Sequence, residues 1–364
     1  MNRPDVALCY GTRPQVIKAS VLRRELARVG SVLALDTGQH YDYELNALLY
    51  AQLGVQPADV LLEVGSGGHA EQTAAILVRA ERELLERKPR AVVVIGDTNS
   101  TVGCAMAAAK LRIPVVHVEA GLRAADALMA EELNRRLVDA IAQVLCTPSA
   151  RATGRVRAER CDAVIAQTGD VARDVLLGAE SRLPDPGAAV PLAAEGPYCY
   201  ATLHRAELTA RPERLVAVLD AMAGLDLPVV LPLHPRTRSV LDAHAPADRW
   251  AGRLTLLPPV GYLESLALTR GAELVVTDSG GVQREAYWLG VPCVTLRSET
   301  EWVETVELGA NLTLAPDDAA EELPAAAARH RARWRDTAGW TRDAYGTGDA
   351  AARVAAAVAG LLDG

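Results

Sequence analysis

Residues 274–286 of the chain read LVVTDSGGVQREA, and this stretch decides the fold class. Its apolar start, 274–277, is typical of a short buried strand. Gly280 and Gly281 then expose backbone N–H groups at a turn, and a helix is expected to begin there. A strand that leads through a glycine turn into a helix is the unit from which parallel α/β sheets are built.

The same alternation repeats along the chain. Short β-branched runs alternate with longer segments rich in Ala, Leu and Arg that have helical spacing. We predict strands at 6–10, 32–36, 91–95, 115–118 and 144–147, and then at 199–203, 229–233, 254–257, 274–277 and 293–296. Helices are predicted from near Pro14 to near Gly30 and over 71–88, 328–336 and 349–362, whereas the Pro- and Gly-rich segment 181–197 predicts a loop. Two successive sets of this kind in 364 residues imply two domains, with a hinge near Gly169.

The composition argues against several classes of protein. With 46 acidic and 38 basic residues the net charge is −8, which is unfavourable for a protein whose main partner is a nucleic acid. No run approaches ~20 consecutive apolar residues, and the first residues, MNRPDVALCYGTRP, lack the layout of a signal peptide. The cysteines form no C-x-x-C pair, and the histidines show no zinc-binding spacing. We therefore expect a cytoplasmic protein with reduced cysteines, no metal, and neither a membrane nor a nucleic-acid partner.

Polar residues directly after the predicted strands are the candidates for a site, because ligands collect at the carboxyl ends of parallel strands. In the first half these residues are Arg13, Lys18, Asp97, Glu119 and Glu131. For Asp97 alone, capping of the next helix is the favoured interpretation, whereas Glu131 is also suited to stabilising a helix dipole and the two basic residues to a solvated helix start. Glu119 is expected to face a cleft, because an unpaired buried carboxylate is unfavourable.

The second half has two further candidate sites. His204 and His234 follow successive strands, and although either could be structural, their repetition favours a site. The clearest anion-binding pattern is Ser279-Gly280-Gly281, where a helix start can hold a diphosphate. Glu285, one turn into that helix, can accept hydrogen bonds from a ribose.

Ten segments together resemble the non-hydrolysing UDP-N-acetylglucosamine 2-epimerases. In chain order they are GTRPQVIK, TGQHYDYE, GSGGHAEQT, GDTNST, HVEAGLR, AEELNRR, TLHRAE, DSGGVQREA, LGVPCVTLRSETEW and YGTGDAAAR. The resemblance implies an α/β protein of GT-B architecture, with two Rossmann-like parallel-sheet domains facing across a cleft. Residues 1–168 and the C-terminal helix 346–364 would form the domain that carries the acid/base carboxylates, and residues 169–345 the domain that binds UDP.

The resemblance also implies an activity and a set of roles. The family interconverts UDP-N-acetylglucosamine and UDP-N-acetylmannosamine without cofactor or metal, by eliminating UDP to a 2-acetamidoglucal and adding it back. By resemblance, the catalytic residues are Asp97, Glu119, Glu131 and His204; the substrate-binding residues are Arg13, Lys18, Arg135, Ser279, Gly280, Gly281 and Glu285; and an allosteric site is lined by Gln39, His40 and Gln72. A homodimer is expected on the same ground.

The sequence departs from the family pattern at several positions, notably Gln15, Leu208, Ser265, Arg284 and Trp302. Gln15 replaces an acidic residue, and Arg284 reverses a charge beside the predicted diphosphate site. Four alternatives therefore stay open: a hydrolysing 2-epimerase, a GT-B glycosyltransferase, an inactive UDP-sugar-binding subunit, and an epimerase for another sugar, such as a UDP-2,3-diacetamido sugar or an intermediate of antibiotic biosynthesis. The combination of Asp97, Glu119 and Glu131 favours the epimerase over the glycosyltransferase.

Overall fold

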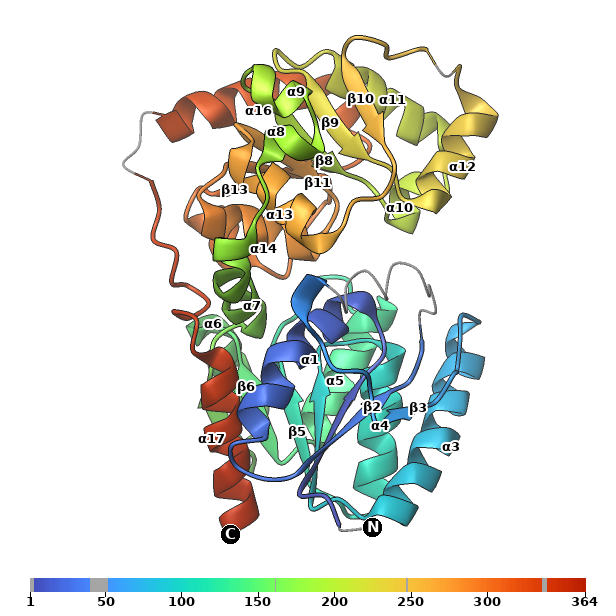
Figure 1. Ribbon diagram of the computed structural model, residues 1–364, viewed down its shortest axis with the longest axis vertical. Helices are drawn as coiled ribbons and strands as arrows, with labels where there is room; N and C mark the ends of the chain where they lie inside the picture. The colour runs from blue at the N-terminus through green and yellow to red at the C-terminus, as the bar shows by residue number, and fades with distance from the viewer. Residues whose placement is uncertain (1–2, 40–51, 161, 247, 336–338) are drawn as a thin grey trace. The chain divides into compact units, whose positions relative to one another are not determined.

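The computed structural model describes residues 3–39, 52–160, 162–246, 248–335 and 339–364 (Figure 1). The chain divides into two compact units, and each contains one parallel sheet covered by helices. Unit 1 comprises 1–179 and 343–364, and unit 2 comprises 180–342. The predicted class, α/β with two parallel-sheet domains, is confirmed. Among the described residues, no helix is both long and apolar enough to cross a membrane.

Unit 1 is built on a seven-stranded sheet with the order β3-β2-β1-β4-β5-β6-β7. Its strands are β1 (Val6–Tyr10), β2 (Val32–Asp36), β3 (Val60–Leu61), β4 (Ala91–Ile95), β5 (Val115–Val118), β6 (Val144–Thr147) and β7 (Val164–Gln167). The five strands predicted here have the predicted bounds, because each is a short, largely buried and mostly apolar run. The edge strands β3 and β7 were not predicted: β3 is only two residues long, and β7 is half-exposed.

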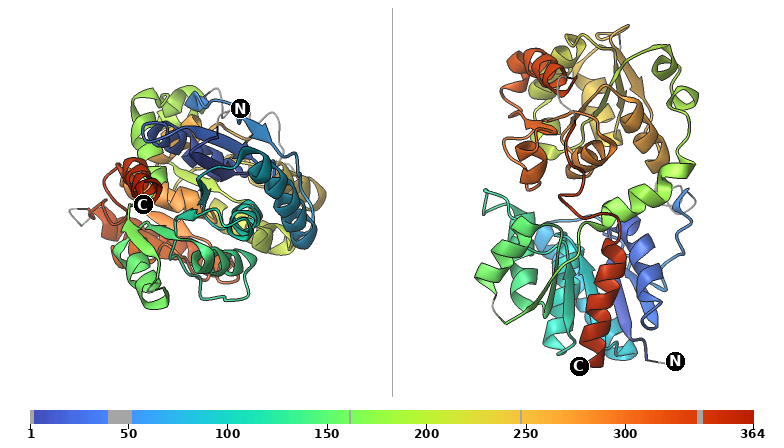
Figure 2. Two further views of the ribbon diagram at one scale, coloured as in Figure 1. Left: turned by 90° about the horizontal axis from the view of Figure 1, so that it is seen from below. Right: turned by 90° about the vertical axis from the view of Figure 1, so that its left-hand side faces the viewer.

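Within the described residues, seven helices of unit 1 are given from end to end. They are α1 (Arg13–Leu26), α3 (His69–Arg87), α4 (Asn99–Lys110), α5 (Ala130–Ile141), α6 (Ala150–Glu159), α7 (Val171–Ala179) and α17 (Ala350–Asp363). Helices α1, α7 and α17 pack against one another, and α4 packs between α3 and α5. In Figure 2 the C-terminal helix α17 lies along the outside of unit 1.

The end of unit 1 differs from the expected boundary at 168/169. The chain stays in unit 1 through Ala179, because α7 packs against α1 and α17. Gly169, where a hinge was expected, instead lies inside the unit, and its φ of 90° allows a close approach to the returning chain. A Cβ there would be 2.9 Å from the carbonyl oxygen of Tyr345. The next residue, Asp170, donates its backbone N–H to the same oxygen at 2.9 Å.

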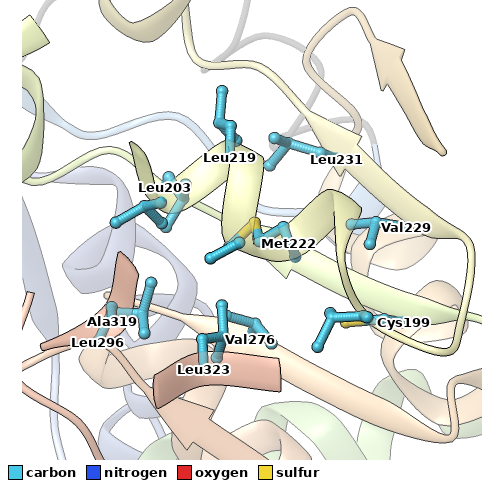
Figure 3. Packing of buried hydrophobic residues seen from close by; sticks show 14 of the residues in the cluster. Cys199, Leu203, Leu219, Met222, Val229, Leu231, Val276, Leu296, Ala319 and Leu323 are labelled. Carbon is cyan, nitrogen blue, oxygen red and sulfur yellow. The ribbon is translucent and has the colours of Figure 1, made fainter. Parts of the chain in front are cut away.

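Unit 2 has a six-stranded sheet with the order β10-β9-β8-β11-β12-β13. The strands are β8 (Cys199–Thr202), β9 (Val229–Pro232), β10 (Leu254–Leu257), β11 (Leu274–Thr277), β12 (Cys293–Thr295) and β13 (Asn311–Thr313). The helices are α10 (Ala206–Thr209), α11 (Pro212–Ala223), α12 (Pro235–His244), α13 (Tyr262–Gly271), α14 (Gly280–Leu289), α15 (Val303–Glu307) and α16 (Ala319–Arg335). Figure 3 shows part of the core, where Met222 and Leu219 of α11 pack with Val229 and Leu231 of β9.

Three features of unit 2 differ from the sequence prediction. The segment 181–197 is not all loop, since it contains the short helices η1 (Glu180–Arg182), α8 (Pro186–Ala189) and α9 (Leu192–Glu195). Asp185 caps α8 through its side chain, and Pro186 occupies the first helical position, where the missing N–H has no consequence. Helix α16 begins at Ala319, well before the predicted 328, and the three-residue strand β13 was not predicted.

Five of the six cysteines lie in the described residues, and all five are buried and free. They are Cys9, Cys104, Cys146, Cys199 and Cys293. Burial raises the pKa of Cys146 and of Cys293 to about 12, so these thiols stay protonated and pack as small apolar groups.

Candidate active site

The turn between β1 and α1 is tightly packed around Gly11. A Cβ at Gly11 would lie 1.9 Å from Thr37 Oγ1, so the turn requires glycine. The side-chain oxygen of Gln15 accepts hydrogen bonds from the backbone N–H groups of Gly11 at 2.9 Å and Thr12 at 3.2 Å. Its amide nitrogen donates to the Ile95 carbonyl at 2.6 Å. Gln15, where the family pattern has an acidic residue, therefore ties the start of α1 to the end of β4.

Lys18 and Glu119 form a buried ion pair at the carboxyl end of the sheet. Lys18 Nζ lies 2.5 Å from Glu119 Oε1, and each side chain is only 7% exposed. Glu119 adopts a φ of 70°, a conformation that is uncommon for a residue with a Cβ. Its other carboxylate oxygen lies 3.3 Å from the point that a Cβ on Gly96 would occupy. The carboxylate of Glu119 thus lies against the turn that carries Asp97.

Asp97 is held by α5 and does not cap α4. Its Oδ2 accepts a hydrogen bond from Arg135 Nη2 at 2.5 Å, and its carbonyl oxygen accepts one from Asn134 Nδ2 at 2.9 Å. Thr98 is the N-cap of α4 and accepts a hydrogen bond from the backbone N–H of Thr101. Of the two readings open for Asp97, the helix cap is therefore wrong. Arg135, predicted by resemblance to bind substrate, thus holds this carboxylate in place.

The first turn of α5 carries two acidic residues with different surroundings. Glu132 is fully buried and lies 3.3 Å from Arg135 Nη1 and 2.8 Å from Arg136 Nε. The predicted residue Glu131 is half-exposed, and its side chain has no ion pair or hydrogen bond within the part of the chain that the structure describes. Sequence analysis missed Glu132, although its spacing of three and four residues from two arginines indicates ion pairs on a helix.

Arg13 differs from the other basic residues of this edge. It is the first residue of α1, is half-buried, and forms no side-chain ion pair or hydrogen bond with any described residue. The guanidinium is thus a cation that no described residue of unit 1 compensates by direct contact. That is the property required of a residue that binds an anionic ligand.

The residues predicted for an allosteric site belong to a hydrogen-bond network inside unit 1. Gln39 and Gln72 are buried, and Gln39 Oε1 accepts from the backbone N–H of Ser100 at 2.9 Å. Gln72 Nε2 donates to the Gly65 carbonyl at 2.7 Å, and its Oε1 accepts from Asn99 Nδ2 at 2.8 Å. Both amides are therefore engaged within the unit. His40 lies outside the described residues.

In unit 2, Asp278 joins the ends of β11 and β8. Its buried carboxylate accepts hydrogen bonds from the backbone N–H groups of His204 at 2.9 Å and Arg205 at 2.8 Å. Its second oxygen lies 3.3 Å from His204 Nδ1, and the His204 side chain is 46% exposed. The sequence placed His204 at a site but gave no role to Asp278, which fixes the position of the His204 backbone.

The Ser279 turn has the structure that its sequence predicted. Ser279 is the N-cap of α14 and accepts a hydrogen bond from the backbone N–H of Val282 at 3.3 Å. Gly280 and Gly281 begin the helix, so their N–H groups are among those without a partner in the helix. Glu285 lies in the second turn of the same helix and is half-buried. The turn combines the positive end of a helix dipole with an acidic residue further along it.

Arg284 and Trp302, two positions at which the sequence departs from the family pattern, contact each other. Both side chains are buried, and Arg284 Cζ lies 3.8 Å from the centroid of the Trp302 ring. Arg284 Nε also donates to the Gly280 carbonyl at 3.1 Å. The guanidinium is thus held by a cation–π contact beside the Ser279 turn. The other two departures in this unit also have neighbours: Leu208 packs in the core, and Ser265 Oγ lies 2.8 Å from the Tyr200 hydroxyl.

Each unit therefore assembles its own group of predicted residues. Unit 1 brings together Asp97, Glu119, Lys18 and Arg135, with Arg13 and Glu131 on neighbouring helices. Unit 2 brings together His204, Ser279, Gly280, Gly281 and Glu285 on β8, β11 and α14 and the turns that follow the strands. His234, the other candidate histidine, follows β9 and is exposed.

Comparison with known proteins gives consistent matches along the chain. The family model described as UDP-N-acetylglucosamine 2-epimerase matches residues 26–359. The chain is 42% identical over 312 residues to UDP-2,3-diacetamido-2,3-dideoxy-D-glucuronate 2-epimerase of Pseudomonas aeruginosa, covering 83% of this chain and 86% of that protein. It is 38% identical over 319 residues to UDP-N-acetylglucosamine 2-epimerase of Methanocaldococcus jannaschii, covering 84% and 87%.

Solved structures match over almost the whole chain. The crystal structure of the M. jannaschii enzyme in complex with UDP-N-acetylglucosamine and UDP superposes with a TM-score of 0.85 at 35% identity, covering 96% of this chain and 97% of that one. The enzyme of Neisseria meningitidis bound to UDP-N-acetylglucosamine has a TM-score of 0.83 at 26% identity, covering 95% and 97%. Because the family model matches most of this chain, the chain belongs to the UDP-N-acetylglucosamine 2-epimerase family.

Proposed function

We propose that this chain is an isomerase that inverts C2 of a UDP-linked 2-acetamido sugar, with UDP-N-acetylglucosamine and UDP-N-acetylmannosamine as its substrate pair. The observation that carries the proposal is a pair of ion-paired carboxylates on adjacent turns, the buried Glu119 with Lys18 and the partly exposed Asp97 with Arg135. Removing a weakly acidic C2 proton requires a carboxylate that is held ionised and in place, and returning a proton to the opposite face requires a second acid.

The proposed reaction proceeds through elimination. A carboxylate takes the C2 proton while the C1–O bond to UDP breaks, and a 2-acetamidoglucal forms. UDP then returns to C1, and a proton is delivered to the other face of C2. Asp97, Glu119 and Glu131 are the candidates for these proton transfers, and the partly exposed Glu131 has no ion-pair or hydrogen-bond partner among the described residues.

Unit 2 carries groups that are suited to stabilising the negative charge on leaving UDP. We assign the diphosphate to the Ser279 turn and His204, and the ribose to Glu285. In unit 1, Arg13 is a candidate for binding an anionic group. The support is the helix start at Gly280, the fixed backbone of His204 and the absence of a protein anion beside Arg13 among the described residues. Lys18 and Arg135 also carry positive charge at this edge of unit 1, although each already pairs with a carboxylate.

A reaction in D2O tests the proposal. The purified protein is incubated with UDP-N-acetylglucosamine in D2O, and products and C2 deuteration are followed by NMR. Deuterated UDP-N-acetylmannosamine in equilibrium with deuterated substrate is the expected result. Free N-acetylmannosamine with UDP would identify a hydrolysing enzyme, and a complete lack of exchange would refute epimerisation of this sugar.

A second candidate substrate follows from one relative. The protein of P. aeruginosa that is 42% identical to this chain acts, by its name, on UDP-2,3-diacetamido-2,3-dideoxy-D-glucuronate. This sugar keeps the C2 acetamido group and the UDP leaving group, so the same carboxylates serve the same elimination. Competition between the two UDP-sugars in one reaction, read as the ratio of kcat/KM, decides which is the substrate.

We also propose a homodimeric, cytoplasmic enzyme that a second substrate molecule activates. Free, buried cysteines are typical of a reducing compartment, and the resemblance supports the other two properties. Light scattering after size-exclusion chromatography measures the oligomeric state. Activation would give a sigmoidal dependence of rate on substrate in the wild type and a changed sigmoidicity in Gln72→Ala, because that amide holds Asn99 and the Gly65 carbonyl.

A further inference from the structure

A histidine inside the sheet of unit 1 faces an oxygen atom at each ring nitrogen. His117 lies in β5 and is fully buried. Its Nδ1 lies 2.7 Å from Asp139 Oδ1, and its Nε2 lies 2.8 Å from the carbonyl oxygen of Gly96. A carbonyl oxygen can only accept a hydrogen bond, so Nε2 must carry a proton. Nδ1 must also carry one if Asp139 is ionised, because a carboxylate only accepts.

The surroundings of Asp139 favour the ionised carboxylate. Its second oxygen accepts hydrogen bonds from Arg123 Nη1 at 2.7 Å and from the backbone N–H of Gly121 at 3.1 Å. Burial raises the pKa of Asp139, but contacts with His117 and then Arg123 outweigh burial and hold this pKa below its ordinary value. The other charged groups near Arg123 are Glu159, which it contacts, and Glu132 at 3.9 Å.

His117 and Asp139 each hold one of the two turns that carry the carboxylates. The Gly96 peptide is fixed on both sides, because its N–H donates to the Val118 carbonyl at 2.9 Å and its oxygen accepts from His117. The next residue along the chain is Asp97. On the other side, Asp139 accepts from Gly121, two residues after Glu119. Glu119 and Gly121 both have positive φ, at 70° and 82°, so this turn needs support.

We propose that His117 donates a hydrogen bond from each ring nitrogen, and that the His117–Asp139 pair is a positioning device that locks the Gly96–Asp97 turn to the Glu119–Gly121 turn. This hydrogen bonding of His117 is independent of substrate. The positioning role rests on the proposed function, because it matters for catalysis only if Asp97 and Glu119 transfer protons. Neither residue of the pair touches the substrate in this assignment.

NMR of the full chain with ¹⁵N-labelled histidine tests the hydrogen bonding of the His117 ring. The His117 signals are assigned as those that remain when each of the other six histidines is replaced by Gln in turn. Spectra are recorded between about pH 7 and about pH 8, and we expect both ring nitrogens of His117 to carry protons there, because each faces an oxygen atom that accepts a hydrogen bond. In Asp139→Asn, Nδ1 loses its proton, because the amide can donate to it. A wild-type His117 with only one protonated nitrogen overturns the proposal.

The same spectrum contains an internal reference. His330 is also buried, but only its Nε2 faces a described acceptor, the Ala310 carbonyl at 3.3 Å, and burial lowers its pKa. His330 should therefore show a single protonated nitrogen over most of this range. A doubly protonated His330 would mean that burial beside a carbonyl is sufficient for protons on both ring nitrogens. The argument that Asp139 is needed for the second proton of His117 would then be wrong.

Kinetics and hydrogen exchange test the positioning role. We expect Asp139→Asn to lower kcat about tenfold or more and to leave KM within about twofold, because a displaced catalytic turn impairs chemistry more than binding. His330→Gln, the matched control in unit 2, should leave kcat within about twofold of the wild type. Unchanged kcat in Asp139→Asn would refute the positioning role.

Hydrogen exchange separates this proposal from the proposed function. The amide of Gly121 should exchange at least about tenfold faster in Asp139→Asn, whether or not the protein turns over either UDP-sugar. If the wild type is inactive but has a doubly protonated His117 and faster Gly121 exchange in the variant, the proposed function fails and the structural lock remains. If the wild type is active, but His117 is not doubly protonated and Gly121 exchange is unchanged in the variant, the positioning device is refuted. The proposed function is then unaffected.

Discussion

Replacing Lys18 by Met should destabilise unit 1 strongly while leaving unit 2 unchanged. Met retains most of the length of the side chain but removes the ammonium that lies 2.5 Å from Glu119. Glu119 would then be a carboxylate 7% exposed without its cation. Removing one partner of a buried ion pair typically costs about 3–5 kcal/mol, because the remaining charge has lost both water and its counter-ion. We expect a loss in this range.

The double variant Lys18→Met/Glu119→Gln separates the charge from the packing. An amide at position 119 has no charge to leave uncompensated, so the double variant should recover about 2 kcal/mol or more of the loss. If the free energy of unfolding falls by roughly 2–3 kcal/mol per M urea, the midpoint of the single variant should lie about 1–2 M urea below that of the wild type.

The cysteines allow the two units to be measured separately. Cys9, Cys104 and Cys146 are buried in unit 1, and Cys199 and Cys293 are buried in unit 2. Pulsed thiol labelling across a urea series, read by mass spectrometry of the peptides, reports the unfolding of each unit. All five tryptophans lie between Trp250 and Trp340, so their fluorescence provides a second measure of unit 2.

Two results would refute this reasoning. If Lys18→Met unfolds at the same urea concentration as the wild type, the ion pair contributes nothing to the stability of unit 1. Buried Glu119 then does not need Lys18 as its counter-ion. If the double variant is no more stable than the single one, the loss comes from packing of the Lys18 side chain and not from charge. A shift of the Cys199 and Cys293 transition would show that the substitution acts beyond unit 1.

Three further predictions concern individual residues. Glu119→Gln should lower turnover by several orders of magnitude while UDP affinity, measured by calorimetry, stays nearly unchanged; near-normal turnover would remove Glu119 from the acid/base set. Glu285→Ala should weaken UDP binding with less effect on the rate at saturation, and unchanged affinity would argue against the ribose contact. Burial lowers the pKa of His330 in the folded chain, so its contribution to stability is present above the unfolded pKa of about 6.5 and is lost as pH falls through the folded value. Urea midpoints between about pH 7 and pH 5 should therefore fall less steeply in His330→Gln than in the wild type, and equal slopes would contradict this assignment.

The strands of the sheets were predictable because their signal is local. Strands such as β4 are fully buried apolar runs, and their ends coincide with glycine or polar residues that a sequence displays directly. Edge strands such as β7 lack that signal, because a half-exposed strand needs no continuous apolar run. Helix α8 was missed because Pro and Gly also favour a short capped helix when Asp precedes them.

The partners of the site residues were not predictable, because they come from distant parts of the chain. Asp97 has the sequence position of a helix cap, and only the fold brings Arg135 of α5 to its carboxylate. Likewise, only the fold brings Lys18 of α1 to Glu119, which follows β5. Arg284 is the clearest case, because the sequence shows only a reversed charge, whereas the structure stacks that charge on Trp302.

The return of the last helix to unit 1 has a consequence for the order of folding during synthesis. Unit 2, at 180–342, is translated in full before α17 emerges, yet α17 packs on α1, which is among the first elements made. At roughly 5–20 residues per second, the ribosome spends about 8–30 s on the intervening segment. During that time the surface of unit 1 that α17 will cover remains exposed, and chaperones can bind it. A chain that ends before α17 is made would have a complete unit 2 and a unit 1 that lacks its final helix.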